Sequence, residues 1–315
     1  MNIRWCISVI GSGTKARFSG GVISPWISLL LLTHPGAACG DNLFVSTGFQ
    51  PSITEFDSSG TGRAFYAGLL TDIDGLALDQ LGNLYAASGC SITKFNSSGT
   101  ITTTLGQGKL NPFGLAFDSA GDLYAAGGGA IWKFNSGGGT GTVFATLGDF
   151  DNLKGLAFDS AGNLYAADDR NSGAIEEFGT NGVGRVFASA GLNWPCGLAF
   201  DSAGNLYVAN QANNTIEIFG VSGIGKVFAD SGLAQPCGLA FDSAGDLYVA
   251  NNGNGTIEKF SLSGGVLSSS GTLFASGLSS PEALVSEMVP EPSAGLLITV
   301  SLAALLPLKR RRNAR

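Results

Sequence analysis

Alternating apolar and polar positions recur along the chain with a period of about 40 residues. The clearest copy is GLAFDSAGNLYVAN at 197–210, where Leu198 and Phe200 alternate with smaller residues, as do Leu206 and Val208. A period of two predicts two short β-strands. The intervening Asp-Ser-Ala-Gly has the chemistry of a short reversal, since aspartate can accept hydrogen bonds from nearby amides and glycine adopts a positive φ freely. Each copy therefore predicts a β-hairpin.

Five copies of this hairpin follow one another, and their opening glycines are 39, 41, 42 and 41 residues apart. These glycines are Gly75, Gly114, Gly155, Gly197 and Gly238. Two more strands follow a hairpin, as in Thr215–Phe219 with Gly225–Ala229, and the pairs 175–178 with 185–188 and 257–260 with 272–275 are equivalent. Four strands in about 40 residues is typical of a β-propeller blade, which buries its faces only by stacking on its neighbours.

The two ends of the repeat region complement each other. Pro281–Val285 is a degenerate first strand with no hairpin partner, and Asn42–Val45 is a second strand with no first strand. Segments 52–56 and 63–67 supply the third and fourth strands of that blade. We therefore predict an all-β fold, a six-bladed β-propeller of four-stranded blades over residues 41–287, closed by pairing of its N- and C-terminal strands.

The repeat P-x-G-L-A-F-D-x-x-G-N-L-Y-V-A-N…N-x-T-I-x-x-F resembles that of NHL propellers and of the related gluconolactonase-like and streptogramin-lyase-like six-bladed propellers. The resemblance covers about residues 41–287. It implies the fold but says little about activity, because such a fold hosts many functions.

Residues 1–40 have the order of a secretory signal peptide. Arg4, Lys15 and Arg17 precede an apolar run at 22–32, and the small residues 36–38 offer a cleavage site. An uncleaved anchor is the alternative. Cys39 is not expected to be lipidated, because Gly36 stands where a lipoprotein signal has leucine.

Residues 288–315 resemble the PEP-CTERM sorting signal of Gram-negative bacteria. A Pro-Glu-Pro motif precedes a short apolar run at 294–308, which predicts a transmembrane helix, and then a basic cluster that favours the cytoplasmic side. The motif residues are Pro290, Glu291, Pro292, Lys309, Arg310, Arg311 and Arg312. The resemblance implies an exosortase-type membrane protease as partner, transient inner-membrane anchoring, and then a cell-surface or extracellular location linked to exopolysaccharide. A plain tail anchor is the alternative.

The charge distribution limits the possible partners of the ring, and the cysteines raise the question of a disulfide. Eight of the 17 basic residues lie in the two terminal segments, whereas nearly all of the 24 acidic residues lie between them. Such an acidic ring repels phosphate, so we do not expect a nucleic-acid partner.

Cys196 and Cys237 occupy the same place in adjacent repeats. Export permits a disulfide between them, but duplication of the repeat explains the pair without a bond, and we favour the interpretation that they are unpaired.

Candidate catalytic groups are sparse. The single histidine, His34, lies in the predicted signal, so the ring has no histidine base or metal ligand. Streptogramin lyases rely on an active-site histidine, which has no counterpart here. The aspartate that recurs at each hairpin turn could bind calcium, but its presence in every full repeat favours a turn cap. No catalytic residue and no cofactor are assigned.

In propellers of this type, the residue before the opening glycine lies at the mouth of the central tunnel. Six residues hold this position, and they are Asp74, Phe113, Lys154, Cys196, Cys237 and Glu282. The gluconolactonase-like family binds a divalent metal at this mouth through Glu, Asn and Asp. Only Asp74 and Glu282 match, as weak candidates, and an acidic rim opposite Lys154 is the favoured interpretation.

Polar residues follow the second strands of three consecutive blades on the same face, among them Asp168, Asn210 and Asn251. Trp194 lies near them in the sequence. Planar amides beside an aromatic ring suit a polyhydroxylated ligand, although Asn and Asp also make good turns. We therefore expect a binding or structural module for polysaccharide or surface proteins. The alternative is a metal-dependent lactonase-type hydrolase.

Overall fold

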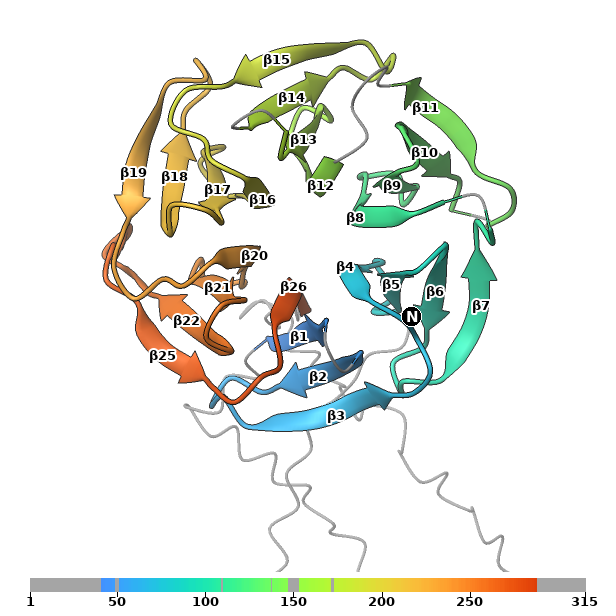
Figure 1. Ribbon diagram of the computed structural model, residues 1–315, viewed down its shortest axis with the longest axis horizontal. Helices are drawn as coiled ribbons and strands as arrows, with labels where there is room; N and C mark the ends of the chain where they lie inside the picture. Colours follow the sequence, from blue (N-terminus) through green and yellow to red (C-terminus); the bar gives the residue numbers. More distant parts are fainter. Residues whose placement is uncertain are drawn as a thin grey trace, which may run out of the picture.

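The chain forms a closed ring of six four-stranded antiparallel sheets around a central axis (Figure 1). A computed structural model describes residues 41–48, 51–108, 110–136, 138–146, 153–170 and 173–287. The predicted all-β, six-bladed propeller is confirmed. Within these residues no helix has the length and apolar character needed to cross a membrane. The two predicted terminal signals, 1–40 and 288–315, lie outside the described residues.

Each blade contributes one strand to the tunnel and a second strand packed behind it. The innermost strands are β26 (Pro281–Glu287), β4 (Ile73–Leu78), β8 (Pro112–Phe117), β12 (Leu153–Phe158), β16 (Pro195–Phe200) and β20 (Pro236–Phe241). The second strands are β1 (Asn42–Thr47), β5 (Leu84–Ser88), β9 (Leu123–Gly127), β13 (Leu164–Asp168), β17 (Leu206–Asn210) and β21 (Leu247–Asn251).

Two further strands carry each blade to the circumference of the ring. The third strands are β2 (Ser52–Phe56), β6 (Ser91–Phe95), β10 (Ala130–Phe134), β14 (Ala174–Phe178), β18 (Thr215–Phe219) and β22 (Thr256–Phe260). The outer strands are β3 (Gly62–Ala67), β7 (Ile101–Leu105), β11 (Thr142–Thr146), β15 (Gly184–Ala188), β19 (Gly225–Ala229) and β25 (Thr272–Ala275). A small extra hairpin, β23 (Leu262–Ser263) with β24 (Val266–Leu267), interrupts the last blade and was not expected from the repeat.

The ring closes through the blade made from both ends of the described region, as predicted. β1 pairs antiparallel with β26, with Phe44 opposite Val285 and Val45 opposite Leu284 (Figure 1). Two hydrogen bonds extend the joint, since Ala283 N–H donates to Ser46 Oγ at 3.0 Å and Gly48 N–H donates to the Ser280 carbonyl at 3.0 Å. Closure pairs the edge of β1 that would otherwise lack an inner strand.

The repeated aspartate caps the turn between the first and second strands. In one blade Asp201 Oδ1 accepts hydrogen bonds from the backbone N–H groups of Ala203 and Asn205, at 2.9 and 2.8 Å. Gly204 has a φ of 84°, which only glycine adopts without cost. The same bonds to the residue four positions on recur at Asp79, Asp118, Asp159 and Asp242. The interpretation of these aspartates as turn caps is confirmed.

Aromatic rings join successive blades. The tyrosine of a second strand meets the phenylalanine that ends the next blade's inner strand, as in Tyr165–Phe200 and Tyr207–Phe241, with ring centroids 5.0 and 5.2 Å apart and edge-to-face geometry. The phenylalanine of the same blade's outer strand also contacts this tyrosine, as Phe187 does for Tyr165 at 5.1 Å. This geometry suits the ring quadrupoles and adds to the apolar area buried between blades.

The opening glycine of each repeat is required by close packing of the inner strands. A Cβ placed on Gly197 would collide with the backbone carbonyl oxygen of Cys237 in the next blade. Gly75, Gly114 and Gly155 face the same obstacle, the carbonyl of the tunnel residue one blade on. Because that obstacle is backbone rather than a flexible side chain, it cannot move aside cheaply.

We predict that Gly197→Ala destabilises the ring, at a cost of about 1–3 kcal/mol from overpacking against a fixed backbone. Gly220→Ala is the matched control, because no atom lies within 4 Å of its added Cβ. The measurement is chemical unfolding of both variants beside the wild type. Equal stability of the two variants would contradict this account of the repeated glycine.

Candidate functional site

The six tunnel positions lie around one cavity of about 320 Å³. The sequence assigned Asp74, Phe113, Lys154, Cys196, Cys237 and Glu282 to this place, and the structure puts all six in its wall. The repeats are nearly identical in their turns and strands, yet these six side chains are mostly unlike one another. The tunnel mouth is therefore where the chain departs from its own repeat.

Two carboxylates occupy neighbouring blades at the closure. Asp74 is on β4 and Glu282 is on β26, the strands that lie side by side around the axis (Figure 1). Burial raises the pKa of Asp74, and Asp72 adds to the rise while Lys154 opposes it. Burial also raises the pKa of Glu282, and repulsion from Asp74 raises it further. The charge of Asp74 thus makes Glu282 harder to ionise.

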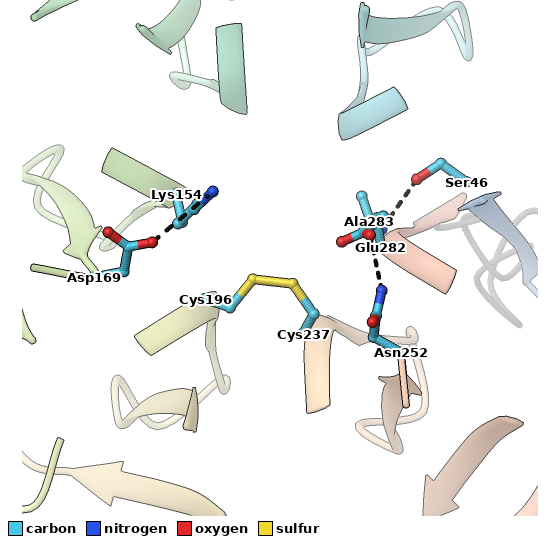
Figure 2. The surroundings of a disulfide bond; sticks show 8 residues. All are labelled: Ser46, Lys154, Asp169, Cys196, Cys237, Asn252, Glu282 and Ala283. Atoms are coloured by element: carbon cyan, nitrogen blue, oxygen red, sulfur yellow. Dashed lines mark hydrogen bonds and ion pairs between the residues drawn. A yellow bond between two sulfur atoms is a disulfide. The ribbon is translucent and has the colours of Figure 1, made fainter. Parts of the chain in front are cut away.

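A lysine faces these carboxylates across the tunnel. Figure 2 shows Lys154 and Glu282 on opposite sides, with the disulfide between them. The Lys154 ammonium lies 4.0 Å from the centroid of the Phe113 ring and 3.9 Å from Asp169 Oδ2. Its charge lowers the pKa of both Asp74 and Glu282, against the effect of burial. The mouth therefore carries both signs of charge at fixed positions.

Cys196 and Cys237 form a disulfide, which corrects the expectation that they are unpaired (Figure 2). They lie on β16 and β20, which run side by side next to the tunnel, and their Cα atoms are 5.1 Å apart. That separation is within the range a disulfide spans. The sequence showed equivalent positions but not how closely the ring brings adjacent inner strands together. Cys90 is free and exposed.

Asn210 and Asn251 do not form an exposed rim, contrary to expectation. Both are fully buried at the ends of β17 and β21. Asn210 accepts from Asn193 N–H at 3.2 Å and donates to the Gly191 carbonyl at 3.1 Å. Asn251 makes the equivalent bonds to Ala234 and Gly232, at 3.1 and 3.2 Å. These amides hold the loops that enter the inner strands, so neither offers a surface to a ligand.

Asp168 occupies the equivalent position on β13 and is also buried. Its two carboxylate oxygens accept from the Arg170 guanidinium, at 3.1 and 3.2 Å. This is a two-point charge-assisted pair, which fixes the orientation of both side chains. Asp168 is therefore an ion-pair partner inside its own blade.

Trp194 is exposed, as the amide-and-aromatic interpretation requires, but its neighbours differ from those expected. It lines a second cavity, of about 340 Å³, together with Gln211, Ala212, Asn214 and Gln235. Sequence reasoning missed Asn214 and Gln235, although Gln235 directly precedes the proline of the next inner strand. Gln211 also lines the tunnel cavity, so the two cavities share a wall.

The structure adds an amide to the carboxylate pair. Asn252 donates from Nδ2 to Glu282 Oε1 at 2.8 Å (Figure 2). Oxygen ligands of this kind suit hard divalent cations. Among the described residues, no group of three or more His, Cys, Asp and Glu side chains is arranged to hold a metal ion. The oxygen set of Asp74, Asn252 and Glu282 fits a divalent cation only in part, because the lysine charge acts on the same carboxylates.

Comparison with known proteins agrees with the fold. Residues 233–260 match the NHL repeat family. A chain in the crystal structure of a nidogen/laminin complex is 21% identical, with a TM-score of 0.66 over 78% of this chain and 98% of that one. No curated protein sequence matches.

Streptogramin and virginiamycin lyases share the fold as well. A streptogramin B lyase structure is 15% identical, with a TM-score of 0.59 over 79% of this chain and 88% of that one. A catalytically inactive virginiamycin B lyase from Staphylococcus aureus, with a histidine replaced by alanine and with quinupristin present, is 15% identical, with a TM-score of 0.56 over 73% of this chain and 84% of that one. At these identities the likeness shows the β-propeller fold alone, and the NHL match covers one repeat, residues 233–260.

We predict that the disulfide stabilises the ring. It joins residues 41 apart, and removing it costs about 4 kcal/mol when only the entropy of the unfolded chain is counted. Thermal unfolding of Cys196→Ser/Cys237→Ser should occur at a lower temperature than that of the wild type. Cys90→Ser is the control and should unfold as the wild type does. Peptide mapping without reductant that yields no cross-linked Cys196–Cys237 peptide would contradict the bond.

A second prediction concerns Glu282. Its folded pKa is raised above the unfolded value of 4.5, so the wild type loses stability as the pH rises through the folded pKa. Glu282→Gln keeps an acceptor for Asn252 but does not titrate. The variant should therefore be more stable than the wild type at pH 7, and this advantage should vanish below about pH 4.5. The measurement is the melting temperature of both proteins between pH 4 and pH 8, and a constant difference would refute the prediction.

Proposed function

We propose that this protein is an exported propeller that binds a ligand at its tunnel-mouth face and acts as a binding module at the cell surface. The observation that carries the proposal is the convergence of the divergent side chains on one cavity. Asp74 and Glu282 lie on the neighbouring inner strands β4 and β26. Lys154 lies across the tunnel from Glu282, with its ammonium over the Phe113 ring. A repeat protein with only a structural role has no need to vary this one position while keeping the rest of the repeat.

Burial at the mouth supports a binding role. The raised pKa values of Asp74 and Glu282 mean that charging both carboxylates at neutral pH costs stability. Natural proteins often accept such a cost at sites that recognise ligands. A ligand that neutralises or hydrogen-bonds these groups recovers part of that cost on binding. The ligands we propose are polysaccharide components of the extracellular matrix or other surface proteins.

Export and sorting are parts of the same proposal. The signal-like residues 1–40 and the Pro290-Glu291-Pro292 motif with its apolar run and basic cluster support it. The Cys196–Cys237 disulfide also supports it, because disulfides persist in oxidising compartments outside the cytosol. An exosortase-type protease would then remove the basic tail before the propeller reaches the surface.

Binding is favoured over the lyase chemistry of the structural relatives. Replacement of a histidine accompanies loss of activity in the virginiamycin B lyase variant. The single histidine of this chain is His34, which precedes the propeller. The ring therefore has no imidazole to serve as a general base.

A second candidate function is that of a metal-dependent lactonase of the gluconolactonase-like family. The observation that favours it is the contact of Asn252 with Glu282 beside Asp74, since that family binds its metal through the same three residue types. These residues would hold a divalent cation, which would polarise the lactone carbonyl. One carboxylate would then have to act as both ligand and base, so binding remains the favoured proposal.

The test is calorimetry of the exported protein against neutral, uronic-acid and amino-sugar oligosaccharides. We expect binding of at least one class, weakened about tenfold or more in Lys154→Gln or Glu282→Gln, because each change removes a charged group from the mouth. Lys226→Gln, on the exposed outer strand β19, is the matched control and should bind as the wild type does.

The same protein samples also test the lactonase alternative. Titration with calcium, manganese and zinc, followed by an assay on aldonolactones, measures metal affinity and turnover. Metal-dependent turnover that Asp74→Asn and Glu282→Gln abolish would replace the binding proposal by the lactonase. Equal sugar affinity in the wild type and both tunnel variants would remove the tunnel mouth as the binding site.

A further inference from the structure

We propose that the cavity beside Trp194 is a saccharide subsite that takes the apolar face of a neutral sugar ring. It lies next to the tunnel mouth, at the blade made of β16–β19, and its wall is formed by Trp194, Gln211, Ala212, Asn214 and Gln235. The proposal rests on the proposed function in one respect, the surface setting in which the propeller meets extracellular glycans.

The composition of this wall selects the chemistry of the ligand. The indole of Trp194 is 57% exposed, so a large aromatic surface faces the cavity and solvent. Three of its four neighbours carry planar amides, and none carries a charge. A pyranose has C–H groups on one face, which pack on an aromatic ring, and hydroxyls at its edge, which both donate to and accept from amides. The cavity volume, about 340 Å³, is at the lower end of the range for small-molecule sites.

The tryptophan is not required by the backbone. Trp194 has a φ of 53°, a left-handed value that is costly for a bulky residue. The residues at the same point of other blades, Asp72, Gln235 and Ser280, have φ values of 37°, 48° and 50°. This conformation therefore belongs to the entry into the inner strand, where small or polar residues serve as well. An exposed indole at 194 is consequently not explained by the fold.

The walls of the cavity are held in place before any ligand arrives. Gln211 N–H donates to the Trp194 carbonyl at 3.0 Å, and buried Asn210 ties down the loop that leads to Trp194. On the opposite wall, Gln235 N–H donates to Asn214 Oδ1 at 2.6 Å. Buried Asn251 holds the loop that leads to Gln235. A fixed wall loses little conformational entropy when a ligand binds.

Gln211 connects this subsite to the tunnel mouth, because it lines both cavities. A chain of sugar residues with one neutral ring on Trp194 can therefore extend toward the charged groups of the mouth. Asn210 and Asn251 act here as positioning residues.

The experiment measures binding of cellotetraose, mannotetraose and galactotetraose to the full exported protein by calorimetry. We expect millimolar or tighter affinity for at least one of the three. Trp194→Ala should weaken it by about tenfold or more, because both the stacking surface and its buried area are lost. Trp194→Phe should keep part of the affinity, and Gln235→Ala should lose about threefold to tenfold, as expected for one hydrogen bond.

Two exposed residues at the opposite end of the blades supply matched controls. Val221→Ala removes an exposed apolar side chain from the β18–β19 turn, and Gln80→Ala removes an exposed amide from the β4–β5 turn. Both should bind as the wild type does. Because Trp194 is largely exposed, its variants should also keep the wild-type melting temperature, and Gln235→Ala tests the site independently.

Each outcome decides one of the two proposals. Failure of all three neutral sugars to bind, or equal binding by the wild type and Trp194→Ala, would overturn the subsite. Binding of charged sugars that depends on Lys154 but not on Trp194 would overturn the subsite and keep the proposed function. Loss of neutral-sugar binding in Trp194→Ala with no effect of the tunnel variants would establish the subsite and remove the tunnel mouth from the proposed function.

Discussion

The pairing of β1 with β26 is the interaction on which the rest of the structure depends. A blade buries its two faces only against neighbours, so an open chain of blades would leave two apolar faces in water. The closing blade takes its inner strand, β26, from the C-terminal end of the ring region and its other three strands, β1–β3, from the N-terminal end. It also brings Glu282 beside Asp74, two residues that are distant in sequence but adjacent around the axis. The acidic side of the tunnel mouth exists only when the ring is closed.

The fold and the site use different positions of the same repeat. The glycines, the capping aspartates and the Tyr–Phe contacts recur from blade to blade because each solves the same packing problem. The six tunnel positions line a cavity instead of filling a contact between blades, so their side chains can serve recognition without disturbing the packing of the repeat. Buried Asn210 and Asn251 show an intermediate case, in which a repeated position supports the loops that carry Trp194 and Gln235.

The carboxylates at the tunnel mouth reduce the stability of the ring but provide the groups that would recognise a polar ligand. Burial and repulsion from Asp74 raise the pKa of Glu282, whereas the amide of Asn252 and the charge of Lys154 lower it. A hydrophobic pair at these two carboxylate positions would avoid the cost of burying charge but would bind no polar ligand. The neutral cavity beside Trp194 carries no such cost, and the two cavities meet at Gln211.

The sequence alone determined the number of blades, most strands, the closing pair and the six tunnel positions. The blades, the strands and the closing pair follow from a period of two within strands and of about 40 between repeats. The tunnel positions follow from the resemblance of the repeat to that of known six-bladed propellers. Position in the repeat thus predicted that Asp74 and Lys154 line one tunnel.

Only the tertiary structure decided which side chains meet across blades and which are buried. The 5.1 Å separation of the Cys196 and Cys237 Cα atoms depends on how tightly the inner strands pack around the axis, which no spacing reveals. Asn210 is buried while Gln211, its neighbour, lines both cavities, because a strand ends between them and the chain turns outward. The contact of Asn252 with Glu282 likewise joins two neighbouring blades. Such contacts depend on the curvature of the whole ring, and a linear pattern of residue types does not encode that curvature in any single repeat.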